Sequence, residues 1–259
     1  MNSTASSPPP SRAVAAAAGL WFFVAATGLA IFATYIGVSY GRAALGGAPG
    51  ESRWVAGDGL GNAALSVHLV FALLMTAIGV LQLIPALRRR VPALHRTLGR
   101  VFLVGALLGS LSGFYLVWVR GTVGGLPMHL AISLNGVLIM AFGWLAWQHA
   151  RARRFTEHRR WALRLFMAAN GVWFFRVGLM LWLMIWQAPV GFDPKSFTGP
   201  FVYTLAFAQF LLPLGVLELY LRTRGRGRVL ALTLVLLSLA TAVGIFGATM
   251  GLWLPRLNG

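Results

Sequence analysis

Five histidines lie in an otherwise apolar sequence, and four of them form a repeat. His68 is followed 27 positions later by His95, and His129 is followed 29 positions later by His158. Each interval is about one membrane crossing plus a tight turn. Imidazole titrates near neutral pH and is the commonest metal ligand among side chains. We call His68 and His129 the outer pair, and His95 and His158 the inner pair.

The composition is that of a membrane protein. The chain has 259 residues, of which 58% are hydrophobic and 10% are charged, and its mean hydropathy is +0.75. A soluble domain carries about 25% charged residues. The net charge of +17 does not indicate nucleic-acid binding, because the cations lie in short segments between apolar runs. The absence of cysteine excludes disulfides, thiolate-ligated haem and iron–sulfur clusters.

Seven apolar runs are long enough to cross a membrane as helices, which need about 20 residues each. They cover residues 13–40, 63–87, 94–119, 127–150, 157–187, 200–221 and 229–254. The first run is too long for the core of a signal peptide, so we expect an uncleaved helix. The sequence predicts an all-α integral membrane seven-helix bundle over 13–259, with a four-helix core at 63–187. A polar, Pro-rich tail at 1–12 should be disordered.

The distribution of positive charge predicts how the bundle is oriented. Cytoplasmic segments of membrane proteins are enriched in Lys and Arg. With the N-terminus inside, the inner segments hold 16 of the 22 Lys and Arg residues and the outer segments hold five, while Arg176 lies within an apolar run. We therefore predict a multi-pass protein of the bacterial inner membrane, with its N-terminus in the cytoplasm and its C-terminus in the periplasm.

Two interpretations of the four repeated histidines remain open. In the first, the outer pair and the inner pair each ligate the iron of a b-type haem between facing helices, giving one or two haems in the bundle core. In the second, the inner pair are interfacial cations among arginines and the outer pair form hydrogen bonds across helices. Glycines 105, 109 and 113 share one helix face, which allows either close helix packing or room for a flat cofactor.

Arg176 lies 18 residues after His158, which is five helical turns along the same face of the predicted helix. It would then point into the bundle near the level of the outer pair. It could neutralise a haem propionate or bind an acidic substrate. Alternatively, it could pair with backbone carbonyls, Asn135 or Gln209.

Two further polar residues receive structural interpretations from the sequence. His149 breaks the repeat and is close to Arg151, which places it among lipid headgroups. Glu218 lies four residues before Arg222, so we expect these two side chains to pair. A proton-relay role for Glu218 is the less favoured alternative.

The segments LHRTLGRVF (94–102) and HRRWALRLF (158–166), with Arg176 downstream, resemble a family of bacterial multi-pass membrane proteins known as a domain of unknown function. This resemblance covers about residues 64–180 and implies a membrane location. More distantly, histidines on four consecutive helices are similar to the diheme transmembrane cytochromes b that include ferric reductases. That similarity implies pairing of His68 with His129 and of His95 with His158. The inner pair departs from the pattern because it lies at the membrane edge.

These observations favour transmembrane electron transfer through haem b, which would make the protein a membrane oxidoreductase. The partners would be the lipid bilayer and a quinol or small redox partner, with no nucleic acid. The alternative is a transporter or a protein that binds lipid or an anionic solute without a redox cofactor, in which the inner cations hold an anionic headgroup. A third option is a non-catalytic structural or assembly subunit.

Overall fold

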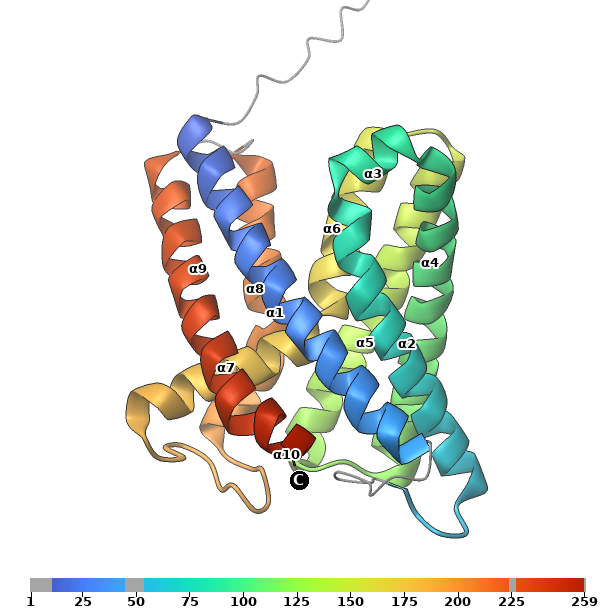
Figure 1. Cartoon of the computed structure of the whole chain (residues 1–259), viewed down its shortest axis with the longest axis vertical. Coiled ribbons are helices and arrows are strands. Elements are labelled where there is room, and N and C mark those ends of the chain that lie inside the picture. Colours follow the sequence, from blue (N-terminus) through green and yellow to red (C-terminus); the bar gives the residue numbers. More distant parts are fainter. Residues whose placement is uncertain (1–10, 45–53, 224–226, 259) are drawn as a thin grey trace, which may run out of the picture.

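The computed structural model describes residues 11–44, 54–223 and 227–258, so most of the predicted disordered tail lies outside the described residues. Within these ranges the protein consists of helices and their connections, which confirms the all-α prediction (Figure 1). The helices are α1 Arg12–Ala44, α2 Gly59–Leu83, α3 Pro85–Arg90, α4 Pro92–Tyr115, α5 Gly125–Arg151, α6 Phe155–Ala169, α7 Gly171–Trp186, α8 Pro200–Arg222, α9 Arg228–Ala248 and α10 Leu254–Asn258. A π-helical turn follows α4 and another follows α9.

Six of the described helices are long and apolar enough to cross a membrane, and α6 with α7 forms a seventh span if this bent pair counts as one. This agrees with the seven predicted runs. The run predicted at 63–87 ends earlier, at Leu83, and its last residues belong to the short helix α3. The reason is Pro85, which has no N–H and forces Ile84 into an extended conformation (φ −76°, ψ 113°).

The predicted straight helix at 157–187 is wrong, because the chain bends by 51° between α6 and α7. Asn170 lies at the bend, and its side-chain amide donates to the carbonyl of Phe166 at 2.8 Å. Asparagine competes in this way with the helix's own hydrogen bonds, and the glycine that follows adds backbone freedom. The bend also removes the argument that Arg176 and His158 share one helix face.

The helices form two groups that separate toward one end (Figure 1). Helices α2 to α6 form one group, in which α2 packs on α4, α4 on α5, and α5 on α6. Helices α1, α8 and α9 form the other, with α1 packed on α9, and α7 lies against α8 and α9. We call the end that carries α3 and the first turn of α1 the basic end. Helix α10 lies at the opposite end.

At the opposite end, Arg120 ties the segment after α4 to the start of α2. Its guanidinium lies 3.5 Å from the carboxylate of Asp58 and donates to the carbonyl of Gly61 and to Asn62 Oδ1, each at 3.1 Å. The same Asp58 caps α2 by accepting from the N–H of Gly61 at 2.8 Å. The cap places the start of α2 at Gly59, four residues before the predicted start at residue 63.

The connection between α7 and α8 is also at this end (Figure 1). Asp193 Oδ1 accepts from the backbone N–H of Lys195 at 2.7 Å, and this hydrogen bond lowers the pKa of the Asp193 carboxyl. The backbones of Asp193 and Thr198 form an isolated β-bridge. Gly199 has a φ of +137° and lies so close to Gly191 that a Cβ there would meet the Gly191 carbonyl oxygen. The connection is therefore an ordered turn.

The arrangement predicts that residues 89 and 196 lie on opposite sides of the membrane. Because the native chain has no cysteine, Arg89→Cys and Ser196→Cys can each be labelled without background. In cells with an intact inner membrane, a membrane-impermeant maleimide should modify Ser196→Cys and should modify Arg89→Cys only after the membrane is opened. Labelling of both variants from the periplasm would contradict this topology, and the reverse pattern would invert the predicted orientation.

Candidate functional site

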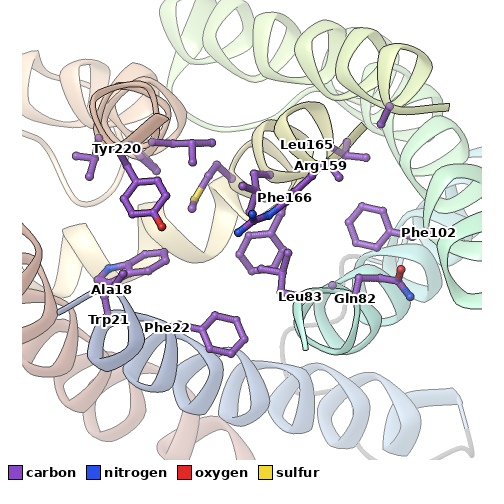
Figure 2. Close-up of a pocket in the computed structure, with 18 of the residues that line it drawn as sticks. Ala18, Trp21, Phe22, Gln82, Leu83, Phe102, Arg159, Leu165, Phe166 and Tyr220 are labelled. Carbon is purple, nitrogen blue, oxygen red and sulfur yellow. The ribbon is translucent and has the colours of Figure 1, made fainter. Parts of the chain in front are cut away.

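A cavity of about 1390 Å³ lies between the two helix groups. Each of the helices α1 to α9 contributes to its wall, and we call it the central cavity. It lies on the side of the bend at Asn170 that faces the basic end, and its deeper part reaches α7 and α8. Figure 2 shows side chains from both groups pointing into it. Ordinary small-molecule sites have about 300–1,000 Å³, so this cavity is large.

Five arginines line the central cavity, and they come from four helices. They are Arg88 of α3, Arg96 and Arg100 of α4, Arg151 of α5 and Arg159 of α6. None of the described residues in the cavity wall is an aspartate or a glutamate. In Figure 2 Arg159 extends toward the middle of the cavity beside Phe166. The cavity therefore carries a concentration of positive charge that its own wall does not neutralise.

The remaining wall is mainly apolar. Phe22 and Trp21 of α1 face Phe102 of α4 and Phe166 of α6 across the space (Figure 2). Deeper in, the side chains of α7, α8 and α9 that line the cavity are mostly aliphatic, and Phe174, Gln209 and Thr241 are exceptions. The cavity thus combines a cationic end with a long apolar interior, as an amphiphilic ligand requires.

The structure brings the inner pair of histidines to this cavity. His95 and His158 both line it, and His158 Nδ1 lies 2.9 Å from the carbonyl oxygen of Ala146. His95 Nδ1 and Gln82 Nε2 are buried in the cavity wall and have no hydrogen-bond partner in the protein. Buried polar atoms are rarely left without a partner. His95 Nδ1 and Gln82 Nε2 are therefore exceptions that no described residue satisfies.

The outer pair of histidines lies elsewhere, and each member contacts a different carbonyl. His68 Nδ1 lies 2.9 Å from the carbonyl oxygen of Gly109, on α4. His129 Nε2 lies 3.1 Å from the carbonyl oxygen of Thr122, and its ring meets that of Trp118 edge-on at 5.6 Å. Hydrogen bonds across helices were one of the two interpretations of these residues, and for His68 the structure shows such a contact.

The glycine face of α4 shows whether a haem has room beside His68 of the outer pair. Side chains of α2 fill this face: a Cβ on Gly105 would lie 3.2 Å from Phe71 and Met75, and one on Gly113 would lie 3.4 Å from His68. The glycines therefore serve close packing of α2 on α4. The residues present do not leave room for a flat ring between His68 and α4. At the central cavity, by contrast, the inner pair has space beside it.

Arg176 is in α7, beyond the bend, and its guanidinium lies 5.3 Å from the centre of the Phe32 ring of α1. It also donates to the carbonyl of Val172 at 3.5 Å, one turn back in its own helix. Arg176 does not line the central cavity. A pairing with a backbone carbonyl was one of the sequence-based alternatives, whereas the contact with Phe32 was not foreseen. Figure 1 shows why: α7 runs toward α9 and away from α6.

His149, which the sequence assigned to the headgroup region, is in the last turn of α5. Its Nδ1 is buried and has no hydrogen-bond partner in the protein. Neighbouring residues of the same turn, Trp147, Ala150 and Arg151, line the central cavity. His149 is therefore beside the cavity and does not form part of its wall.

An ion pair between α6 and α8 joins the two helix groups near the cavity, and it corrects the expected pairing of Glu218 with Arg222. The carboxylate of Glu218 accepts from Arg164 Nε at 2.6 Å and from Arg164 Nη2 at 3.1 Å. The guanidinium also lies 4.4 Å from the centre of the Trp161 ring. Sequence spacing favoured a partner on the same helix, but the bidentate geometry of an arginine and a carboxylate is stronger.

The comparison with known protein families agrees with this architecture. A family described as a predicted membrane protein, DUF2306, matches residues 65–212, which is more than half of the chain. The chain belongs to the DUF2306 family. The match begins in α2 and ends in α8, so it includes the helices that carry the cavity arginines and all five histidines. No curated protein and no solved structure matches the chain significantly.

We predict that the ion pair between Arg164 and Glu218 stabilises the family fold measurably. The side chains are 18% and 34% exposed, so a single change leaves the other charge poorly solvated. Arg164→Met and Glu218→Leu should each reduce the free energy of unfolding, and the double variant should recover part of the loss. In a double-mutant cycle of detergent-solubilised protein we expect a coupling of about 1–2 kcal/mol.

The matched control is the exposed pair of Arg160 and Glu157, whose side chains are 48% and 40% exposed. The same cycle with Arg160→Met and Glu157→Leu should give a coupling of less than about 0.5 kcal/mol. Equal coupling for the two pairs would contradict a specific role for the contact between α6 and α8.

Proposed function

We propose that the central cavity binds an anionic amphiphile from the membrane, a molecule with a phosphate or carboxylate headgroup and a long apolar body. The observation that carries the proposal is the set of five arginines in the wall of an otherwise apolar cavity, without a carboxylate among the described lining residues. This corresponds to the lipid-binding or anionic-solute alternative indicated by the sequence.

The headgroup would lie among the arginines. Guanidinium groups donate two parallel hydrogen bonds to carboxylate or phosphate oxygens, and they are more weakly hydrated than ammonium groups. Arg96 and Arg100 are one helical turn apart on α4, while Arg159 approaches from α6. An anion between the two helices would receive donors from both. It would also lie near the unpartnered polar atoms of His95 and Gln82.

The apolar body would occupy the rest of the cavity. The volume of about 1390 Å³ exceeds that of typical small-molecule sites, and its walls are aromatic near α1 and α4 and aliphatic near α8 and α9. Burial of hydrocarbon stabilises a complex in detergent or lipid only weakly, because the ligand leaves an apolar phase. Affinity should therefore depend mainly on the headgroup and selectivity on the shape of the interior.

Replacing a cavity arginine should weaken binding of an anionic amphiphile. Binding of hexadecyl phosphate to detergent-solubilised protein can be measured by equilibrium dialysis, with hexadecylphosphocholine as a probe of no net charge. Arg159→Gln and Arg88→Gln should each reduce affinity for hexadecyl phosphate about ten- to hundredfold, since a hydrogen bond to a charged group contributes about 1.5–3 kcal/mol. The affinity of the wild type should also fall as salt is added.

The controls are the neighbouring residues Arg160 and Arg89, which do not line the cavity. Arg160→Gln and Arg89→Gln change the net charge by the same amount and should leave binding within about twofold of the wild type. Equal losses in cavity and control variants would show that only overall charge matters. Preference for the phosphocholine probe would end the proposal.

Haem binding at the inner pair is the second candidate function, and one observation favours it. His95 and His158 line the same cavity, and the contact of His158 Nδ1 with a carbonyl leaves its Nε2 available as a ligand. A bound haem would supply one-electron transfer between a quinol or soluble donor and an acceptor on the other side. The protein's part would be to ligate the iron and to pair cavity arginines with the propionates.

Haem content separates the two candidates. Protein expressed with ample haem should show a b-type reduced-minus-oxidised spectrum if the inner pair ligates iron. His95→Ala and His158→Ala should then each abolish the haem, whereas His149→Ala should retain it. His68→Ala reports whether the outer pair holds a second haem, and the filled glycine face predicts no change. Colourless wild-type protein would exclude electron transfer through haem.

A further inference from the structure

Tyr220 of α8 brings a hydroxyl group to the central cavity from the helix group that contributes no arginine to the described wall. It lines the cavity, and Figure 2 shows its hydroxyl end pointing into the space. The hydroxyl makes no hydrogen bond to a described residue. A phenol hydroxyl both donates and accepts hydrogen bonds. Tyr220 therefore offers a ligand one donor from the side opposite the arginines.

The ring of Tyr220 is held by packing within its own helix group. It lies against a cluster of buried side chains from the first two turns of α1 and of α9. These side chains are Val14, Ala17, Leu230 and Leu234. The packing involves the ring and not the hydroxyl. Exchange of this tyrosine for phenylalanine therefore removes the donor and keeps the contacts that position it.

The ion pair between Arg164 and Glu218 fixes how α6 and α8 lie against each other, and it places Arg159 and Tyr220 at similar depths. Helix α6 runs inward from the basic end and α8 runs toward it (Figure 1). Arg159 and Tyr220 are therefore both on the basic side of this ion pair, by about 7.5 Å and about 3 Å of helical rise. In Figure 2 the two side chains point toward one another across the cavity.

Arg159 is as available to a ligand as the Tyr220 hydroxyl is. Its guanidinium has no ion pair or hydrogen bond with a described residue, whereas Arg164 on the same helix is occupied by Glu218. Guanidinium groups donate hydrogen bonds and accept none, and the phenol can donate as well. A headgroup that binds between Arg159 and Tyr220 must therefore accept hydrogen bonds from two opposite sides.

We infer that the headgroup is a phosphate monoester whose terminal oxygens bridge Arg159 of α6 and the hydroxyl of Tyr220 of α8. A monoester has three strongly accepting terminal oxygens around its phosphorus, so it can accept from both sides while its ester bond leads to the apolar interior. A carboxylate has only two oxygens, and both lie on one side of its carbon. A phosphodiester likewise keeps only two terminal oxygens.

The charge of the wall agrees with this class of ligand. Five arginines line the cavity and none of the described lining residues is a carboxylate. A phosphate monoester carries a charge of about −1.5 to −2 at neutral pH, which is more than a carboxylate or a diester supplies. The inference rests on the proposed function and narrows the ligand from anionic amphiphiles in general to phosphate monoesters.

Two probes that differ by one methyl group test this assignment: hexadecyl phosphate and methyl hexadecyl phosphate. The methyl ester removes one terminal oxygen and one negative charge and keeps the tail. Equilibrium dialysis at pH 8 keeps the monoester a dianion, because the second pKa of a phosphate ester is about 6. The wild-type protein should bind the monoester about tenfold more tightly or better, since the diester gives up one hydrogen bond to a charged group.

Tyr220→Phe assigns this preference to the hydroxyl. Affinity for hexadecyl phosphate should fall about tenfold or more, and affinity for methyl hexadecyl phosphate should fall less than about twofold, because the methoxy oxygen of the diester is a weak acceptor. Binding of the diester also shows that the variant is folded. The control is Tyr203→Phe, on the same helix but outside the cavity wall, and it should keep both wild-type affinities.

The outcomes distinguish the inference from the proposed function. If hexadecyl phosphate binds and depends on Arg159, but Tyr220→Phe leaves its affinity unchanged, the bridging role of Tyr220 is wrong and the proposed function stands. Equal affinities of the two probes for the wild type, or equal losses of both in Tyr220→Phe, would overturn the preference for a monoester in the same way. If hexadecyl phosphate does not bind to the wild type, the proposed function fails and this inference fails with it.

Discussion

The shortage of carboxylates is the constraint on which the rest of this structure depends. The chain has 22 Lys and Arg residues but only five Asp and Glu residues. Three of these carboxylates pair with arginines outside the cavity wall: Asp58 with Arg120, Glu157 with Arg160 and Glu218 with Arg164. Among the described residues, most arginines of the basic end therefore have no carboxylate beside them. In a membrane, anionic headgroups attract basic segments by about 1 kcal/mol per cation.

The sequence predicted the helices well because a membrane imposes a strong and local rule. A helix must satisfy its backbone internally and must be long enough to cross, so apolar runs bounded by basic turns identify the spans. The same rule placed the end of the second helix too late, because the apolar run continues to residue 87 whereas Pro85 ends the helix at Leu83. It also missed the bend at Asn170, because one asparagine followed by glycine in a run of 31 residues leaves the average hydropathy unchanged.

The candidate site could be predicted only in part, because contacts between distant segments decide it. Basic segments could be read from the sequence, and the histidine-arginine motifs at 94–102 and 158–166 include residues that line the central cavity. However, nine helices build the cavity wall, and no local pattern records which side chains from α1, α8 and α9 face those of α4 and α6. Glu218 illustrates the limit, since its partner is 54 positions away and a basic residue four positions away was the natural expectation.

The bend between α6 and α7 connects these observations. In a hydrocarbon environment, backbone groups released by a broken helix must be satisfied by protein, water or ligand, and transporters use such breaks as substrate sites. Here Asn135 satisfies one carbonyl at the end of α6, and Asn170 satisfies another. Both side chains donate through their amide nitrogens. Their amide oxygens do not take part in these two hydrogen bonds. A straight helix would continue along the axis of α6 instead of turning by 51°. The break therefore directs α7 toward α9, so that the two helix groups lie apart around the cavity.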